Sequence, residues 1–149
     1  MTAFLAITDL IAAALAGAPA LGRYGKVLRG RRTTLPQTEP CGLRVNAVRH
    51  NAQALDIEGD AFQWESTVVV AALARATPDQ DAEAALDPLI ADVFARLRAI
   101  TPPPGVIDLV LDPSISIDID EADQTVAVAS VAMHVKHITQ SAALTAVTA

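Results

Sequence analysis

Cysteine and aromatic residues are scarce in this sequence, which limits how the chain can be stabilised. Cys41 is the single cysteine, which excludes an internal disulfide framework and a cysteine-based zinc site and suits a reducing compartment. Aromatic residues make up 3% of the chain, so the core must come from the aliphatic residues among its 52% of hydrophobic positions. The 149 residues fit one domain, residues 1–149, which can bury a core without covalent staples.

Catalytic and nucleotide-binding motifs are also missing. Lys26 follows Gly25, but Val27 stands where a phosphate loop needs serine or threonine, and the first glycine of such a loop is absent. No G-x-S-x-G segment occurs. We interpret Cys41 as a structural residue, because a catalytic thiol needs a base and an orienting group. We therefore expect that the protein is not an enzyme and has no catalytic residues.

The histidines and acidic residues of the sequence are not spaced so that they could converge on one metal ion. His134 and His137 have odd spacing on an expected strand, so they point to opposite faces, and we expect both at the surface near the end of that strand. A nearby acidic cluster lacks the glycine and the distal glutamate of an EF-hand loop and predicts a solvated turn. This cluster comprises Asp118, Asp120, Glu121 and Asp123. Neither a metal ion nor a cofactor is expected.

The apolar N-terminal stretch lacks the features of a targeting or membrane-spanning segment. It has no basic residues at its start, and Asp9 interrupts its apolar run. The run is also too short to span a bilayer. We predict a packed helix here and a cytoplasmic protein.

Hydrophobic periodicity predicts two helices and four strands. The helices are expected over residues 2–16 and 79–100. The second has Thr77 as a plausible N-cap and either a kink at Pro88 or a new segment capped by Asp87. Strands are expected over residues 42–51, 62–75, 107–120 and 125–138. The order predicts an α+β fold, with an antiparallel sheet of about four strands and two helices packed on one face.

The expected core joins the apolar faces of one strand and one helix. Its predicted members are Trp64, Val68, Val70, Leu86, Leu89, Val93, Phe94 and Leu97. An interface anchor is the alternative interpretation of Trp64. On the strand over 107–120, the alternation predicts that three isoleucines face inward, namely Ile115, Ile117 and Ile119.

A basic segment stands out because the chain is otherwise acidic, with a net charge of −6. Five of the eleven basic residues fall between Gly22 and Arg32, namely Arg23, Lys26, Arg29, Arg31 and Arg32. We predict a long loop over residues 22–40, in which these five side chains contact a partner or DNA. A solvated loop without a partner is the alternative. Of the two contacts, we favour an acidic protein surface over nucleic acid.

Residues Ala47 to Leu97 carry a resemblance to a known family. They read AVRHNAQALDIEGDAFQWESTVVVAALARATPDQDAEAALDPLIADVFARL. A charged strand, a strand with a W-x-S pattern, an acidic gap and a long amphipathic helix follow in the order found in bacteriophage tail terminators. The segment resembles the minor tail protein U-like family of tail completion proteins, including gene transfer agent equivalents. Residues 1–46 and 106–138 fit that order loosely.

The resemblance implies a structural virion protein. Members form a hexameric ring at the head-proximal end of the tail tube, stop its growth and offer a surface for head joining. The implied partners are further copies of the chain, the tail tube protein, the head–tail connector and, transiently, DNA in the lumen. The implied location is the tail of a phage-like particle assembled in the host cytoplasm. A head–tail connector or neck protein, and a small ligand-binding or enzymatic α+β domain, remain alternatives. A short C-terminal tail is expected over residues 139–149.

Overall fold

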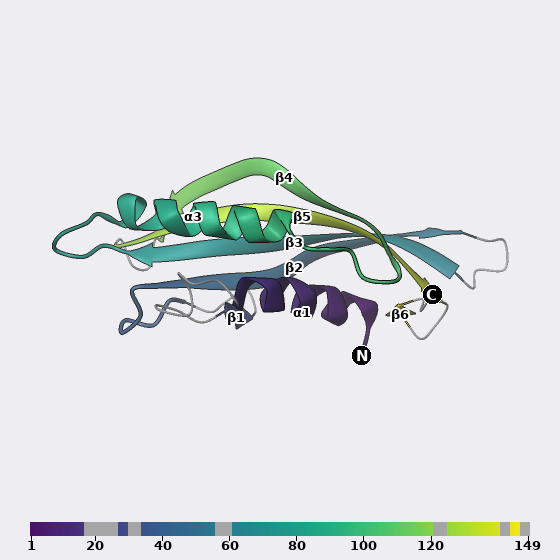
Figure 1. The fold of residues 1–149 in the computed structure, drawn as a ribbon. Helices are drawn as coiled ribbons and strands as arrows, with labels where there is room; N and C mark the ends of the chain where they lie inside the picture. Colours follow the sequence, from purple (N-terminus) through teal and green to yellow (C-terminus); the bar gives the residue numbers. More distant parts are fainter. Residues whose placement is uncertain (17–26, 30–33, 56–60, 121–124, 141–143, 147–149) are drawn as a thin grey trace.

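The computed structural model describes residues 1–16, 27–29, 34–55, 61–120, 125–140 and 144–146. These residues form two helices and six strands (Figure 1). The helices are α1 (Ala3–Ala16) and α3 (Ala82–Arg98). The strands are β1 (Val27–Arg29), β2 (Cys41–Ala54), β3 (Ala61–Arg75), β4 (Val106–Ile119), β5 (Val126–Gln140) and β6 (Thr145–Ala146). Among the described residues, neither helix has the length and apolarity needed to cross a membrane.

Four long strands form an antiparallel sheet in the order β2-β3-β5-β4, which confirms the predicted fold class. Two short strands extend it. β1 pairs in parallel with β2 over Leu43–Val45, and β6 pairs with the end of β5. The segment predicted as a long loop over residues 22–40 therefore contains the strand β1, and the segment predicted as a C-terminal tail from residue 139 contains the end of β5 and the strand β6.

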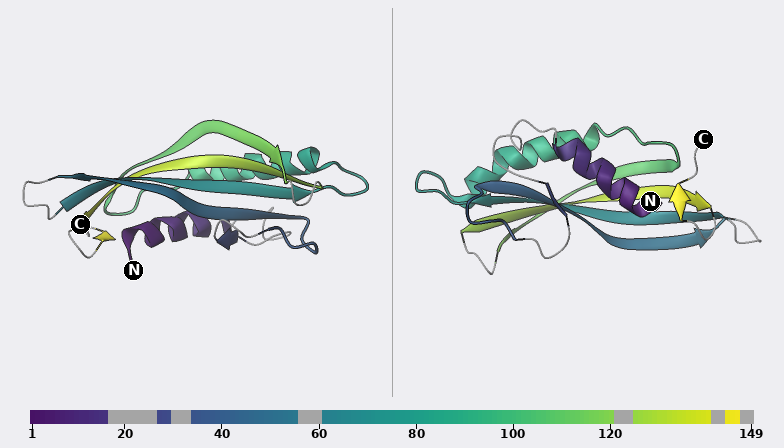
Figure 2. Two further views of the ribbon diagram at one scale, coloured as in Figure 1. Left: turned by 180° about the vertical axis from the view of Figure 1, so that it is seen from behind. Right: turned by 90° about the horizontal axis from the view of Figure 1, so that it is seen from below.

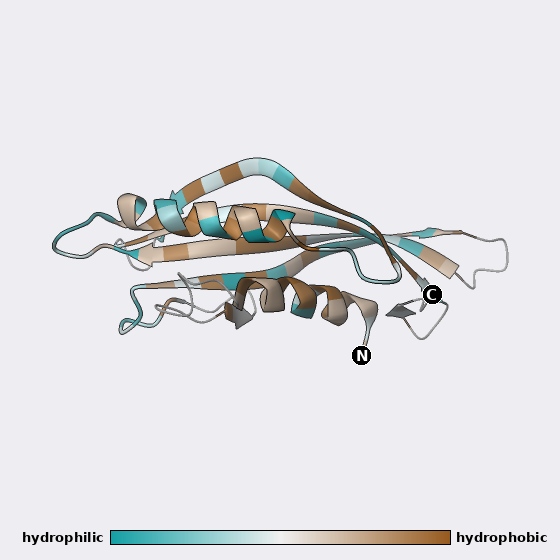
Figure 3. Cartoon of the chain, viewed as in Figure 1, coloured by the Kyte–Doolittle hydropathy of each residue, from teal (hydrophilic) through white to brown (hydrophobic). Residues whose placement is uncertain are grey.

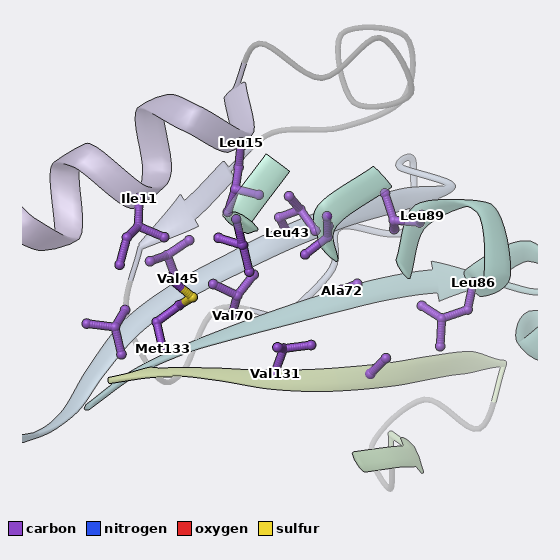
Figure 4. Close-up of a cluster of buried hydrophobic side chains, with 14 of the residues drawn as sticks. Ile11, Leu15, Leu43, Val45, Val70, Ala72, Leu86, Leu89, Val131 and Met133 are labelled. Atoms are coloured by element: carbon purple, nitrogen blue, oxygen red, sulfur yellow. The ribbon is translucent and has the colours of Figure 1, made fainter. Parts of the chain in front are cut away.

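Both helices pack on one face of the sheet, which we call the helix face. Figure 2 shows α1 and α3 close together, with α1 contacting β2 and α3 contacting β3 and β5. Side chains of both helices join one buried cluster with alternate residues of three strands (Figure 4). The cluster includes Ile7, Ile11 and Leu15 of α1, Leu86, Leu89, Val93 and Leu97 of α3, and Leu43, Val45, Val68, Val70, Val131 and Met133 of the strands. An alternating strand pattern and a helical stripe account for this packing.

Most of the predicted core is confirmed. Six of the eight predicted residues are buried in this cluster, Phe94 is half-buried against it, and Trp64 is half-buried outside it. On the opposite face, Leu35 is buried against Ala71, Leu73 and Val126. Part of the segment predicted as a loop therefore covers the second face of the sheet.

The start of α3 differs from the prediction. Asp81, rather than Thr77, is the N-cap, and its carboxylate accepts a hydrogen bond from the backbone N–H of Ala84 at 2.7 Å. Thr77 instead pairs its backbone with Gln80 in a tight turn. α3 continues through Pro88 as one helix, so no second segment begins at Asp87. Pro88 lies on the exposed side, where it does not interrupt the stripe that faces the sheet.

The isoleucines of β4 are a second correction. Ile115 and Ile117 lie opposite Val131 and Ala129 of β5, so they are on the helix face as the alternation predicts. They are nonetheless exposed, with 41% and 56% of their surface accessible, and Ile119 is 52% exposed. β4 is the last strand of the sheet, and α3 packs mainly on β3 and β5. The prediction that these side chains face into a core is therefore wrong.

Candidate assembly surfaces

The five predicted contact residues lie mostly outside the described part of the chain. Arg23, Lys26, Arg31 and Arg32 are not described, and of Arg29 only the backbone is. That backbone ends β1, where Arg29 pairs with Val45 of β2. The structure therefore places the middle of the basic segment on one edge of the sheet. The contacts of the five basic side chains with a partner or DNA remain a prediction.

This edge, which we call the basic edge, consists of β1 and the part of β2 that β1 does not cover. Beyond Val45, β2 pairs with β3 on one side, and no described strand pairs with its other side. β2 carries Arg44 and Arg49 and contains no acidic residue, and β1 carries Arg29. Arg49 is exposed. A register shift follows Ala47, after which Arg49 lies opposite Thr67 on the face away from the helices.

The opposite edge of the sheet, which we call the acidic edge, is β4. It pairs with β5 on one side, and within the described ranges no strand pairs with the other. β4 carries Asp108, Asp112 and Asp118 and no basic residue. Asp108 and Asp118 are exposed. Unpaired backbone groups on such a strand are a template for pairing with another chain.

A bulge divides β4 into two halves. The register shifts between Leu111 and Ile115, and Figure 1 shows β4 arching away from β5. Within this bulge, Asp112 accepts a hydrogen bond from the backbone N–H of Ser114 at 2.9 Å. That bond, the Ser114 hydroxyl and the neighbouring His134 lower the pKa of the Asp112 carboxyl, which favours its charged form.

Apolar side chains are exposed along the whole acidic edge. They alternate with hydrophilic positions along β4, as Figure 3 shows. The exposed members are Ile107, Val110, Ile115, Ile117 and Ile119. Beside them, a hollow of about 390 Å³ lies between α3 and β4, lined mainly by Phe94, Leu97, Leu109 and Leu111. Ile115, Ile117 and Ile119 are on the helix face and Val110 is on the opposite face, so apolar surface is exposed on both sides of this edge. Exposed apolar surface that is contiguous along a strand is typical of an interaction surface.

A polar cluster of the buried Ser66 and His137 with the exposed His50 lies under the N-terminal end of α1. The hydroxyl oxygen of Ser66 is 2.8 Å from Nδ1 of His50 and 2.9 Å from Nε2 of His137. Phe4 of α1 covers both imidazoles, with ring centroids 4.3 Å from His50 and 5.4 Å from His137. Trp64 lies edge-on to Phe4 at 4.8 Å and donates from Nε1 to Thr139 at 2.8 Å. The cluster therefore joins α1 to β2, β3 and β5.

The two histidines of this cluster favour their neutral forms. His137 is 1% exposed, so the prediction of a surface residue is wrong for it. Burial, with a smaller effect from His50, lowers the pKa of His137 to about 4. Burial also lowers the pKa of His50. Nδ1 of His137 has no hydrogen-bond partner among the described residues.

The chemistry of this cluster points to structure rather than to turnover. Ser66 lies between two bases, but it is 1% exposed and Phe4 closes the cluster from the helix face. A nucleophile must reach a substrate. The alternation of β5 could have identified His137, because it shares a face with Val135 and Met133.

One other predicted feature fits the described geometry. His134 pairs opposite Thr67 and lies on the other face from His137, as the odd spacing predicts. Cys41 is half-buried, and burial together with the charge of Glu39 raises the pKa of its thiol. In the described part of the chain, no three His, Cys, Asp or Glu side chains are grouped so that they could hold a metal ion.

Comparison of the chain with protein-family models finds no match, and comparison with curated proteins finds none either.

Proposed function

We propose that this protein is a tail terminator of a phage or a gene transfer agent, a structural protein whose copies form a ring at the head-proximal end of the tail tube. The observation that carries the proposal is a sheet with two edges of opposite charge that no described strand covers, one basic (β1 and β2) and one acidic (β4). Contacts between unlike edges are head-to-tail, and head-to-tail contacts close into rings when the rotation between copies is right.

The order of elements supports the same proposal. The helix, two strands, long helix and two strands occur in the order that the sequence resemblance implies, and the W-x-S pattern lies on β3 with Ser66 and Trp64 on the helix face. In this proposal the ring covers the last layer of the tail tube, which prevents further subunits from adding. In this proposal the basic segment from Gly22 to Arg32 contacts a neighbouring protein, and its described residues, Val27–Arg29, lie on the basic edge.

Tail length in the producing strain tests the function directly. Deleting the gene is expected to give tails of uncontrolled length and heads without tails, because growth then lacks a stop signal and the joining surface. Electron microscopy of the particles measures both, and a plasmid copy of the gene is the control. Tails of normal length, joined to heads in the deletion strain, would overturn the proposal.

A further inference from the structure

We infer that β4 of one copy pairs with the β1–β2 edge of a second copy, so that the sheets of neighbouring subunits join into one. This inference rests on the proposed function, because it names the contact that builds the ring. The occupant of the acidic edge is thus a second copy of this chain. Strand direction, charge, register and exposed apolar surface each favour it.

Strand direction allows the pairing. Each strand is antiparallel to the next in the sheet order β2, β3, β5, β4. Three reversals separate β2 from β4, so these two strands run in opposite directions. When subunits follow one another around a ring in the same orientation, β4 of one therefore lies antiparallel to β2 of the next. Because β1 runs parallel to β2, β4 of one copy is antiparallel to both strands of the neighbouring edge.

Charge selects unlike edges over like edges. Two β4 strands side by side would bring together the three aspartates of each copy, and like charges on facing strands are destabilising. Two basic edges would likewise bring arginines together. Pairing β4 with the basic edge instead places a strand with three aspartates beside two strands that hold arginines and no acidic residue. The aspartates thus oppose one partner and attract the other.

The register aligns the first half of β4 with the uncovered part of β2. Residues that face one another across the sheet form a row, and one row contains Val110, His134, Thr67 and Arg49. A second copy placed alongside without a shift therefore has Val110 facing Arg49. Asp108 is two residues from Val110 on the same face, so it lies diagonal to Arg49, within reach of a long side chain.

The second half of β4 aligns with β1. A second row contains Ile117, Ala129, Ala72, Leu43 and Val27. All of these except Ile117 are buried or half-buried on the helix face. The same placement therefore puts exposed Ile117 beside Val27 of the next copy, where it extends the apolar row of that copy.

The bulge of β4 aligns with the point where the edge of the neighbouring copy changes from β1 to β2. It lies between Leu111 and Ile115, which pair with Met133 and Val131. The row between them contains Ala132, Val69 and Asn46, and Asn46 is the first residue of β2 beyond the pairing with β1. Each half of β4 thus meets one segment of the neighbouring edge.

Charge reversal on each edge tests the contact. The acidic-edge variant carries Asp108→Lys and Asp118→Lys, and the basic-edge variant carries Arg29→Glu and Arg49→Glu. A matched control carries Asp79→Lys and Asp87→Lys, which change the same charge at exposed positions in a turn and on α3. Native mass spectrometry at several concentrations measures association, and circular dichroism confirms folding of each variant.

The expected result has three parts. The wild type and the control associate equally, and each edge variant alone associates at least about tenfold more weakly, which corresponds to about 1.4 kcal/mol or more. An equimolar mixture of the two edge variants regains association, with the two chains alternating, because every contact in it again joins unlike charges. Should a charge variant fail to fold, Ile117→Thr is tested in its place. The Ile117 side chain is exposed in the single copy, so this substitution is expected to weaken association and to leave folding intact.

Three results would overturn the inference: a wild type that stays monomeric at every concentration, edge variants that associate like the wild type, or a mixture of folded variants that does not associate. Unchanged association of the edge variants would leave the proposed function in place. Normal tails in the deletion strain would overturn the function and leave the edge contact in place, so the two failures are distinguishable.

Discussion

At the residue scale, the hydrogen-bonded group of His50, Ser66 and His137 links the three strands β2, β3 and β5 under α1. Ser66 accepts or donates one bond on each side, and its hydroxyl is the link between the two imidazoles. If His137 donates from Nε2 to Ser66 and Ser66 donates to His50, the three groups are matched with both rings neutral. A proton added to His137 enters at Nδ1, so it leaves these bonds in place but puts a positive charge on a ring that is 1% exposed and whose Nδ1 has no partner among the described residues.

We expect the stability of the subunit to fall on acidification because of His137. Its pKa is about 4 in the folded protein, against 6.5 when unperturbed, so the unfolded chain binds the proton first. The stabilisation is complete above about pH 6.5, is lost as the pH falls toward 4, and amounts to on the order of 3 kcal/mol. Urea unfolding across this range measures it.

His137→Asn provides the comparison, because it removes this titration and leaves His50 in place. The slope of the free energy of unfolding against pH is expected to be shallower in the variant between pH 6.5 and 4. Equal slopes in the two proteins would show that His137 does not carry the acid sensitivity.

At the scale of elements, the packing of α3 on the sheet decides the stability of the fold. Leu97 is 1% exposed and joins the main cluster, whereas Phe94 is half-buried and lines the hollow beside β4. Leu97→Ala is expected to lower the free energy of unfolding by about 2–5 kcal/mol. Phe94→Ala is expected to cost less, although it removes more atoms, because part of its ring already contacts water. Urea unfolding of both variants measures the order, and a larger loss for Phe94→Ala would contradict this description of the core.

The fold class could be predicted from the sequence because it depends on local periodicity. The alternation over residues 62–75 and the stripe from Leu86 to Leu97 each identify an element and its buried face. The cap of α3 was not predicted, since Thr77 and Asp81 both suit an N-cap and the turn between Thr77 and Gln80 selects the second. The short strand β1 has too few residues to show a period.

The candidate surfaces were less predictable, for a physical reason. Alternation tells which face Ile117 occupies, but whether that face is covered depends on which strand is at the edge. The pairing of β3 with β5 sets the strand order, and it joins residues that are far apart in the sequence. The basic segment was visible in the sequence, but its position opposite β4 required the topology.

At the scale of the whole molecule, charge is unevenly distributed over the two edges of one sheet. The net charge of −6 by itself predicts repulsion between copies. The basic edge and the acidic edge nevertheless lie at opposite ends of the strand order, so in the proposed ring each copy would present complementary surfaces to its two neighbours. In a closed ring every copy uses both edges, and no open edge strand is left to pair elsewhere.

The mass of the purified protein in solution tests the central claim, that the chain closes into a ring, most directly. Native mass spectrometry over a wide range of concentrations is expected to show the subunit in equilibrium with one larger species of fixed stoichiometry, six copies if the resemblance to tail terminators holds. High salt is expected to shift this equilibrium toward the subunit, because screening weakens contacts between exposed charges. A monomer at all concentrations, or an open series of ever larger species without a preferred size, would contradict the claim.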